Sequence, residues 1–166
     1  MLQVTRKKDK LILEIPSEMH LVEHAIREAV KFLADYSITD TSRFRLVLRE
    51  MLNNAIEHGN HFSDEKKVSL SITYKKPPQP KNDRNTRFLV EMEDEGDGFA
   101  YDTLDFSLPE DPKKIRNRGF LLIHALSENI TFNEQGNKIS VIIACSDEEE
   151  PASAGVPQAH FIPVSM

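Results

Sequence analysis

The mostly apolar segment at residues 10–15 predicts a β-strand, which Pro16 ends. Beyond it, apolar residues recur every three or four positions from Leu21 to Leu33, which is the spacing of an amphipathic helix. Ser17 stands where its hydroxyl would cap the first turn of that helix. The chain is therefore expected to open with a strand and then a helix.

A second helix is predicted between a cap signal at residues 40–42 and a stop at Gly59, because apolar residues continue at helical spacing between them. Each helical residue advances about 100° around the axis. Glu50, Asn54 and His58 therefore share one face, while the apolar residues fall on the opposite face. This line of polar groups makes the helix a candidate site.

Two strands with period-two alternation are predicted at residues 68–74 and 87–93. The segment 75–86 between them is polar and rich in proline, which is typical of an exposed hairpin loop. The two strands are therefore expected to pair with each other in antiparallel orientation.

The remaining pattern predicts a lid, a helix and two more strands. Two prolines break any long helix in residues 100–117, which we interpret as the lid. Residues 119–126 are mostly apolar and predict a largely buried helix. Strands are expected at residues 129–133 and 138–144, on either side of a glycine-containing turn.

Composition and charge narrow the class of protein. The 166 residues suit one domain, expected at 1–146, followed by a polar tail at 147–166 that is expected to be disordered. A net charge of −6 argues against a nucleic-acid surface, and no apolar run approaches the roughly 20 residues of a membrane span. With one cysteine, Cys145, and no signal peptide at the N-terminus, a cytoplasmic protein is expected.

Glu50 and Asn54 carry the chemistry that the second helix offers. A carboxylate can take a proton from an attacking hydroxyl, and an amide oxygen one turn later can ligate Mg²⁺. The alternative is an ordinary solvated helix face, for which a Glu and an Asn four residues apart are unremarkable. The adjacent pair Asn53 and Asn54 is unfavourable inside a helix, which slightly favours a function.

The turn at Asp94, Gly96 and Gly98 follows a predicted strand, and its glycines permit close approach of the backbone to a ligand. The Asp94 carboxylate is suited to accept a hydrogen bond from the amino group of adenine. An acidic, glycine-containing turn is also typical of a hairpin or of a calcium-binding loop, although the longer EF-hand pattern is absent.

Asn117, Arg118 and Gly119 precede the apolar helix, where free backbone N–H groups and a basic side chain are suited to a phosphate. An ordinary helix start with a surface arginine gives the same pattern. Other classes of site lack support: there is no Walker A motif, the third glycine of a dinucleotide fingerprint is missing, and His58 and His61 have no cysteine nearby for structural zinc.

In this order and spacing, the segments resemble the motifs of the GHKL ATPase superfamily, which includes sensor histidine kinases, gyrase and bacterial anti-sigma-factor serine kinases. Residues 50–60 resemble the N-box, 94–99 the first glycine box, 118–123 the second, and 136–137 the turn before the last strand. The resemblance covers residues 11–144. It implies an α/β two-layer sandwich, the Bergerat fold, with helices on one face of a mixed, mainly antiparallel sheet.

The resemblance also implies roles for the motif residues. Asp94 would bind adenine, Asn54 would hold Mg²⁺ against the phosphates of ATP, and Glu50 would be the general base. The glycines and Arg118 would shape or close the pocket. The implied nucleotide-binding residues are Asn53, Asn54, His58, Asp94, Gly96, Gly98, Phe99, Arg118, Gly119, Phe120 and Asn137.

Without a phosphoacceptor helix pair, the chain is most similar to the stand-alone anti-sigma-factor kinases. This resemblance implies transfer of the γ-phosphoryl of ATP to a serine or threonine of a STAS-domain antagonist, with capture of a sigma factor and homodimerisation. Relatives have glycine where Asn117 stands, so the phosphate loop is expected to wrap less closely. Two alternatives stay open: a nucleotide-binding interaction module without kinase activity, and a detached domain that phosphorylates a histidine.

Overall fold

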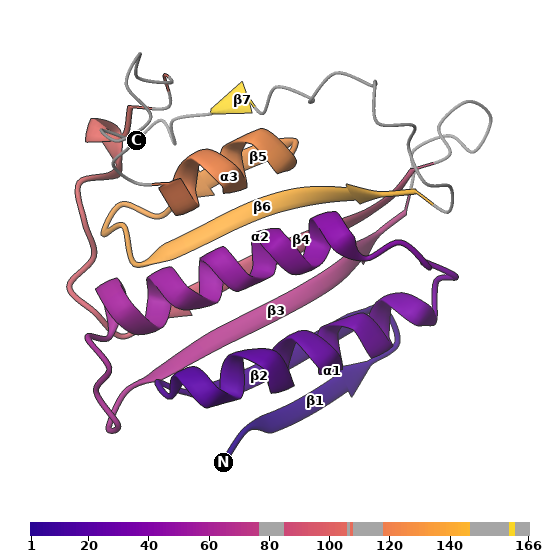
Figure 1. Cartoon of the computed structure of the whole chain (residues 1–166), viewed down its shortest axis with the longest axis horizontal. Helices are drawn as coiled ribbons and strands as arrows, with labels where there is room; N and C mark the ends of the chain where they lie inside the picture. Colours follow the sequence, from indigo (N-terminus) through magenta and orange to yellow (C-terminus); the bar gives the residue numbers. More distant parts are fainter. Residues whose placement is uncertain (77–84, 106, 108–117, 147–159, 162–166) are drawn as a thin grey trace.

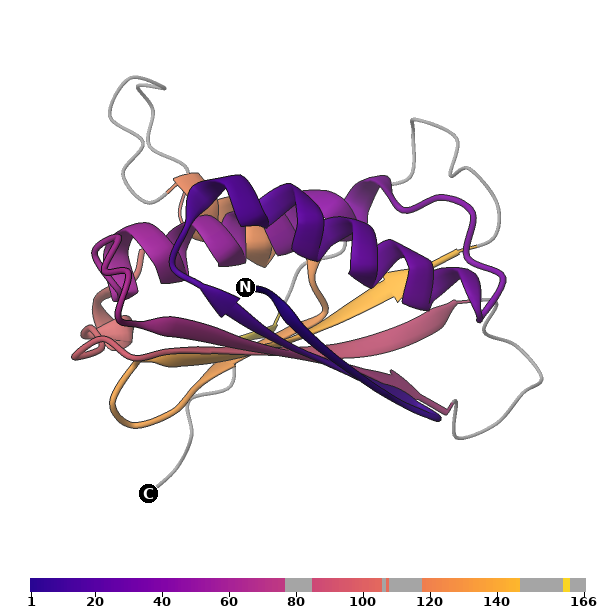
Figure 2. The ribbon, with the colours of Figure 1, turned by 90° about the horizontal axis from the view of Figure 1, so that it is seen from below.

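The computed structural model describes residues 1–76, 85–105, 107, 118–146 and 160–161. In these ranges, one open sheet carries three α-helices on a single face, as Figure 2 shows in a view along the sheet. The predicted two-layer α/β sandwich is confirmed. The helices are α1 (Val22–Ala34), α2 (Ser42–Asn53) and α3 (Arg118–Leu126).

The strands are β1 (Gln3–Lys7), β2 (Lys10–Pro16), β3 (Lys67–Lys75), β4 (Thr86–Asp94), β5 (Asn129–Phe132), β6 (Lys138–Cys145) and β7 (His160–Phe161). They lie side by side in the order β1-β2-β3-β4-β6-β5-β7 (Figure 1). Every neighbouring pair is antiparallel except β5 and β7, which run parallel. The sheet is therefore mixed and mainly antiparallel, as predicted.

Period-two alternation directs one side of each central strand into the core. In β2, β3 and β4 every second residue is buried beneath the helices, and α1 and α2 each bury one apolar stripe against them. The buried residues of these strands are Leu11, Leu13, Ile15, Val68, Leu70, Ile72, Phe88, Val90 and Met92.

Phe88 lies at the centre of an aromatic cluster that joins the sheet to two helices. Its ring centroid lies 6.3 Å from that of Phe32 on α1 and 6.1 Å from that of Phe44 on α2. Tyr36 and Tyr74 complete the cluster at 5.6 and 6.1 Å. Phe88 and Phe44 are fully buried, so these edge-on contacts fix how the helices sit on β4.

The prediction that Ser17 caps the first helix was wrong. After a 3₁₀ turn at Met19–Leu21, α1 begins at Val22, and Ser17 lies before both. The Ser17 hydroxyl is buried and donates to the carbonyl of Lys66 at 2.8 Å, while it accepts from Asn60 Nδ2 at 2.9 Å. The hydroxyl is thus occupied by a link between β2 and the segment before β3.

The second helix is not α-helical as far as Gly59. α2 ends at Asn53, and residues 54–59 form a π-helical turn in which the N–H of Asn60 donates to the carbonyl of Ala55 at 2.8 Å. The wider turn keeps Ala55 and Ile56 buried. The backbone turns into the left-handed region, with positive φ, at His61 and Phe62 and not at Gly59, the predicted end of the helix.

Strand β1 was not predicted, and the helix at 119–126 is less buried than predicted. All residues of β1 are exposed, so no alternation marks it in the sequence. In α3 only Ile123 is buried, because part of the apolar surface of this helix faces a cavity described below.

Other predicted segments lie largely outside the described residues. In the predicted loop at 75–86, residues 77–84 lie outside the described ranges. In the predicted lid at 100–117, residues 106 and 108–117 lie outside them, and these include Asn117. Of the tail, 147–159 and 162–166 lie outside, while β7 pairs its backbone with β5.

Phe88→Ala is expected to lower the free energy of unfolding by about 3–5 kcal/mol, because the cluster cannot close around the lost ring. Urea unfolding followed by circular dichroism measures the loss. Val4→Ala, at an exposed position of β1, is the control and should change stability by less than about 0.5 kcal/mol. Equal effects of the two substitutions would contradict the assignment of Phe88 to the centre of the core.

Candidate functional site

The main cavity of the described chain lies where four element ends meet: the π-helical turn after α2, the end of β4, the start of β6 and the start of α3. Its volume is about 520 Å³, within the usual range for a small-molecule site. The lining residues are Met51, Asn54, Ala55, His58, Gly59, His61, Met92, Asp94, Asp97, Gly98, Phe99, Thr103, Leu104, Phe120, Ile123, Phe132, Gly136, Asn137, Lys138 and Ile139.

The Asp94 carboxyl group lies between β4 and the end of the π-helical turn. Its Oδ1 accepts a hydrogen bond from the N–H of Gly96 at 2.9 Å. The Cα of Gly59 packs so closely against this carboxyl group that any side chain there would collide with it. Burial raises the pKa of Asp94 above its ordinary value, because the charged form loses water.

Asn60 ties the π-helical turn to the strand ends around Asp94. Its Oδ1 accepts from the N–H of Glu95 at 2.8 Å, and its Nδ2 donates to the Lys67 carbonyl at 2.8 Å as well as to Ser17. Asn60 is 1% exposed and all of these groups are satisfied. The backbone directly after Asp94 is therefore held in place from the helix side.

Glu50 and Asn54 both face Gly119, at the amino end of α3. A Cβ placed on Gly119 would lie 2.8 Å from Glu50 Oε2 and 3.4 Å from both Asn54 side-chain heteroatoms. The absence of a side chain at Gly119 thus lets α3 approach the polar face of α2. The sequence prediction that these separated motifs converge is consistent with this packing.

Asn54 fits a ligand-binding role. Among the described residues, its Nδ2 is buried and has no hydrogen-bond partner, which costs free energy unless a ligand supplies one. The amide oxygen beside it is a suitable donor to Mg²⁺, which prefers hard oxygen ligands and retains others from water or phosphate. The residues present therefore fit a magnesium-bound phosphate chain at this end.

Aromatic side chains form part of the cavity lining. The ring of Phe132 stacks on Tyr101 at 5.1 Å and meets Phe99 and Phe120 at 5.5 and 6.0 Å. Tyr101 begins a 3₁₀ turn whose neighbours Thr103 and Leu104 also line the cavity. The described start of the predicted lid is thus packed against the base of the site.

The predicted site residues divide into two groups by position. Those that line the cavity are Asn54, His58, Asp94, Gly98, Phe99, Phe120 and Asn137. Those outside its lining are Glu50, Asn53, Gly96, Arg118 and Gly119. In the second group Gly96 is buried behind Asp94, Glu50 and Gly119 lie against each other, and Arg118 is exposed.

Sequence reasoning missed the contributions of Gly59, Asn60 and Phe132. Gly59 was interpreted as a helix stop, although a Cβ added there would collide with the carboxyl carbon of Asp94, so a side chain fits only if Asp94 moves. Phe132 alternates correctly as a core residue of β5, and nothing in the pattern distinguishes a core residue that also lines a cavity. The only available signal was the run Gly59-Asn60, which is typical of a turn.

Other kinds of site find no support in the described ranges. No group of three His, Cys, Asp or Glu side chains there is arranged to hold a metal ion. Burial raises the pKa of Cys145 to about 12, so its thiol stays protonated at neutral pH. None of the helices in these ranges has the length and apolar composition that a membrane crossing requires.

Asp94→Asn is expected to stabilise the ligand-free protein at neutral pH. The raised pKa of Asp94 means that ionisation costs more in the folded state than in the unfolded chain. The stability contributed by the protonated carboxyl group is therefore lost as pH rises through the folded pKa. Asn keeps the oxygen that accepts from Gly96 and carries no charge, so the gain should shrink as pH falls toward 3.8, the ordinary value for Asp.

Asp40→Asn is the matched control for this prediction, because the sign should reverse. The backbone N–H of Ser42 donates to Asp40 and holds the pKa of that carboxyl group below its ordinary value. Thermal unfolding of both variants and the wild type, between neutral pH and pH 3.8, measures the change in stability that each substitution causes. A destabilised Asp94→Asn at neutral pH would contradict the sign derived from burial.

The family model of the histidine kinase-like ATPase domain matches residues 15–143. This span runs from the end of β2 to the end of β6 and includes all the described residues that line the cavity. The comparison with curated proteins finds no match. Because the family match covers well over half of the chain, the protein belongs to the histidine kinase-like ATPase domain family, and this membership supports ATP binding.

Proposed function

We propose that the protein is an ATP-dependent serine/threonine protein kinase of the anti-sigma-factor type, which acts in the cytoplasm on a STAS-domain antagonist. The observation that carries the nucleotide part is a pair of polar groups that line one cavity. Asp94 contributes a half-buried carboxyl group, and Asn54 contributes a buried Nδ2 without a hydrogen-bond partner. This pair suits a ligand with a hydrogen-bonding base and a polyphosphate.

In the proposed complex, Asp94 accepts a hydrogen bond from the amino group of adenine, and the apolar wall with Phe99 and Phe120 excludes water from the base. Asn54 holds Mg²⁺, which when bound neutralises charge on the phosphates. The amino end of α3 at Arg118 and Gly119 supplies N–H groups and a positive charge for the phosphate chain.

Glu50 is the proposed general base. It takes the proton of the serine or threonine hydroxyl, whose oxygen forms a bond to the γ-phosphorus while the bond to the bridging oxygen breaks and ADP leaves. Glu50 lies one helical turn before Asn54, against Gly119 and outside the lining of the cavity. This position is suited to a hydroxyl that arrives on a protein rather than one bound with the nucleotide.

The partners are proposed from the family resemblance of the motifs. The motifs resemble those of kinases that phosphorylate STAS-domain antagonists, bind a sigma factor and form homodimers. We propose the same partners for this chain, and transfer to a STAS-domain protein is the step that distinguishes a kinase from a binding module.

Asn54→Ala should weaken binding of Mg-ATP by at least about tenfold, since it removes the proposed magnesium ligand. Asp94→Asn should weaken binding of ATP and ADP alike, with or without Mg²⁺. The Asn oxygen keeps the hydrogen bond from Gly96, and an NH₂ group replaces the carboxyl oxygen that would accept from adenine. Isothermal titration calorimetry on the full chain measures both.

Glu57→Ala is the matched control, because this residue of the π-helical turn is exposed, lies outside the cavity lining and should leave affinity unchanged. Absence of saturable ATP binding by the wild-type chain at millimolar nucleotide would overturn the proposed function.

Glu50→Gln should bind ATP as the wild type does and slow phosphoryl transfer by about 10²-fold or more, since it removes the base and keeps the shape. Transfer of radiolabelled γ-phosphate to a purified STAS-domain protein measures the rate. Glu57→Gln, at an exposed position of the π-helical turn, is the control.

The acid stability of the product separates the remaining classes. A label that survives acid supports a serine or threonine phosphate, whereas an acid-labile label indicates a histidine kinase. ATP binding without transfer to any STAS-domain partner would favour an interaction module without kinase activity.

A further inference from the structure

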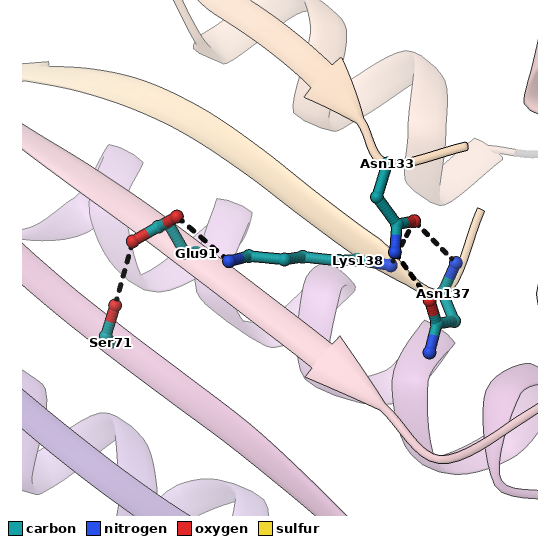
Figure 3. A network of polar contacts seen from close by, with 5 residues as sticks. All are labelled: Ser71, Glu91, Asn133, Asn137 and Lys138. Carbon is teal, nitrogen blue, oxygen red and sulfur yellow. Dashed lines mark hydrogen bonds and ion pairs between the residues drawn. The ribbon is translucent and has the colours of Figure 1, made fainter. Parts of the chain in front are cut away.

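The turn between β5 and β6 is organised by one side chain, that of Asn133. Its Oδ1 accepts hydrogen bonds from three consecutive N–H groups, those of Gly136 at 2.9 Å and of Asn137 and Lys138 at 3.1 Å each. Its Nδ2 donates to Asn137 Oδ1 at 2.7 Å (Figure 3). Strand β5 ends at Phe132, one residue before the predicted end, and Asn133 begins the turn that follows.

Asn137 passes this constraint to Asp94. The two residues exchange hydrogen bonds: Asn137 Nδ2 donates to the Asp94 carbonyl at 2.9 Å, and the Asp94 N–H donates to the Asn137 carbonyl at 3.0 Å. Because Asn133 donates to the Asn137 oxygen, the Asn137 NH₂ group must face Asp94. Rotation of the Asn137 amide would bring two oxygens together at Asp94 and two NH₂ groups together at Asn133.

The two turns also interlock through their backbones. Gly98 (φ +79°) packs against the carbonyl of Gln135, and Gly136 (φ +77°) packs against that of Phe99, so a side chain at either glycine would collide. Gln135 Nε2 donates to the Gly96 carbonyl at 3.3 Å. The conformation of residues 94–99 is thus complementary to that of residues 133–137.

The β6 end of this turn is anchored on the sheet face opposite the helices. Lys138 Nζ pairs with Glu91 Oε1 at 3.2 Å, and Ser71 donates to Glu91 Oε2 at 3.3 Å, as Figure 3 shows. The contacts run across β3, β4 and β6. The turn is therefore fixed on the sheet independently of the described start of the lid.

We infer that Asn133 is a positioning residue for nucleotide recognition, which acts through Asn137 to place Asp94. Asn133 lies outside the lining of the cavity, so its effect on a ligand is indirect. The inference rests on the proposed function, in which Asp94 binds adenine. It assigns a role in base recognition to a residue that belongs to none of the sequence motifs.

The test compares Asn133→Ala, Asn133→Asp and Asn137→Ala by calorimetry with ATP and GTP. Asn133→Ala should bind ATP about tenfold more weakly. Its affinity for GTP, which lacks the 6-amino group for Asp94, should fall less, so the preference for ATP narrows. Asn133→Asp keeps the three accepted hydrogen bonds and loses the donated one, so its ATP affinity should lie between those of Asn133→Ala and the wild type.

The double variant Asn133→Ala/Asn137→Ala gives the sharpest readout. If Asn133 acts through Asn137, the double variant should bind ATP no more weakly than Asn137→Ala alone. Glu134→Ala, at an exposed position of the same turn, is the matched control and should bind as the wild type does. Should Asn133→Ala fail to fold, the comparison of Asn133→Asp with Glu134→Ala decides the question.

The inference and the proposed function fail in different ways. Wild-type ATP affinity and wild-type ATP/GTP preference in Asn133→Ala would overturn the role of Asn133 and leave the proposed function standing. Additive losses in the double variant would overturn the route through Asn137. Absence of ATP binding by the wild-type chain would overturn both.

Discussion

The partial burial of one carboxyl group, that of Asp94, is the constraint on which the site depends. Desolvation of this group costs free energy, and the N–H of Gly96 offsets only part of that cost. Glycine at position 59 lets the π-helical turn close over it. Asn60 and Asn137 then hold the backbone on either side of the carboxyl group, so the strand end cannot relax toward water.

The change from α- to π-helix at Asn54 separates two tasks within one segment. The regular part, α2, packs its apolar stripe on the sheet and against Phe88. The π-helical turn at residues 54–59 lines the cavity with Asn54, His58 and Gly59. Its residues Ala55 and Ile56 remain buried in the core. One continuous stretch of sequence thereby provides both a rigid support and an irregular binding wall.

Hydrophobic periodicity was sufficient to predict most strands and the helix that carries Glu50 and Asn54, while the family resemblance supplied the two-layer arrangement. The sequence pattern failed for β1, whose residues are all exposed, and for Ser17, whose hydroxyl bonds to Asn60 from a distant segment. The residue pattern predicted the site as separate motifs, and the family resemblance predicted that they form one pocket. Asn133 and Asn60 act through hydrogen bonds between turns far apart in the chain, and a single sequence contains no pattern for such contacts.

The two edges of the sheet differ in what another strand would meet. Within the described residues, one edge is the two-residue strand β7 and the other is the five-residue strand β1. Arg6 and Lys7 stand on the β1 edge, followed by Lys8. A second copy of β1 that approached this edge would bring like charges together, a common protection against edge-to-edge aggregation. A segment with acidic side chains would meet no such repulsion. The charge on β1 therefore favours pairing with acidic strands over pairing with basic ones.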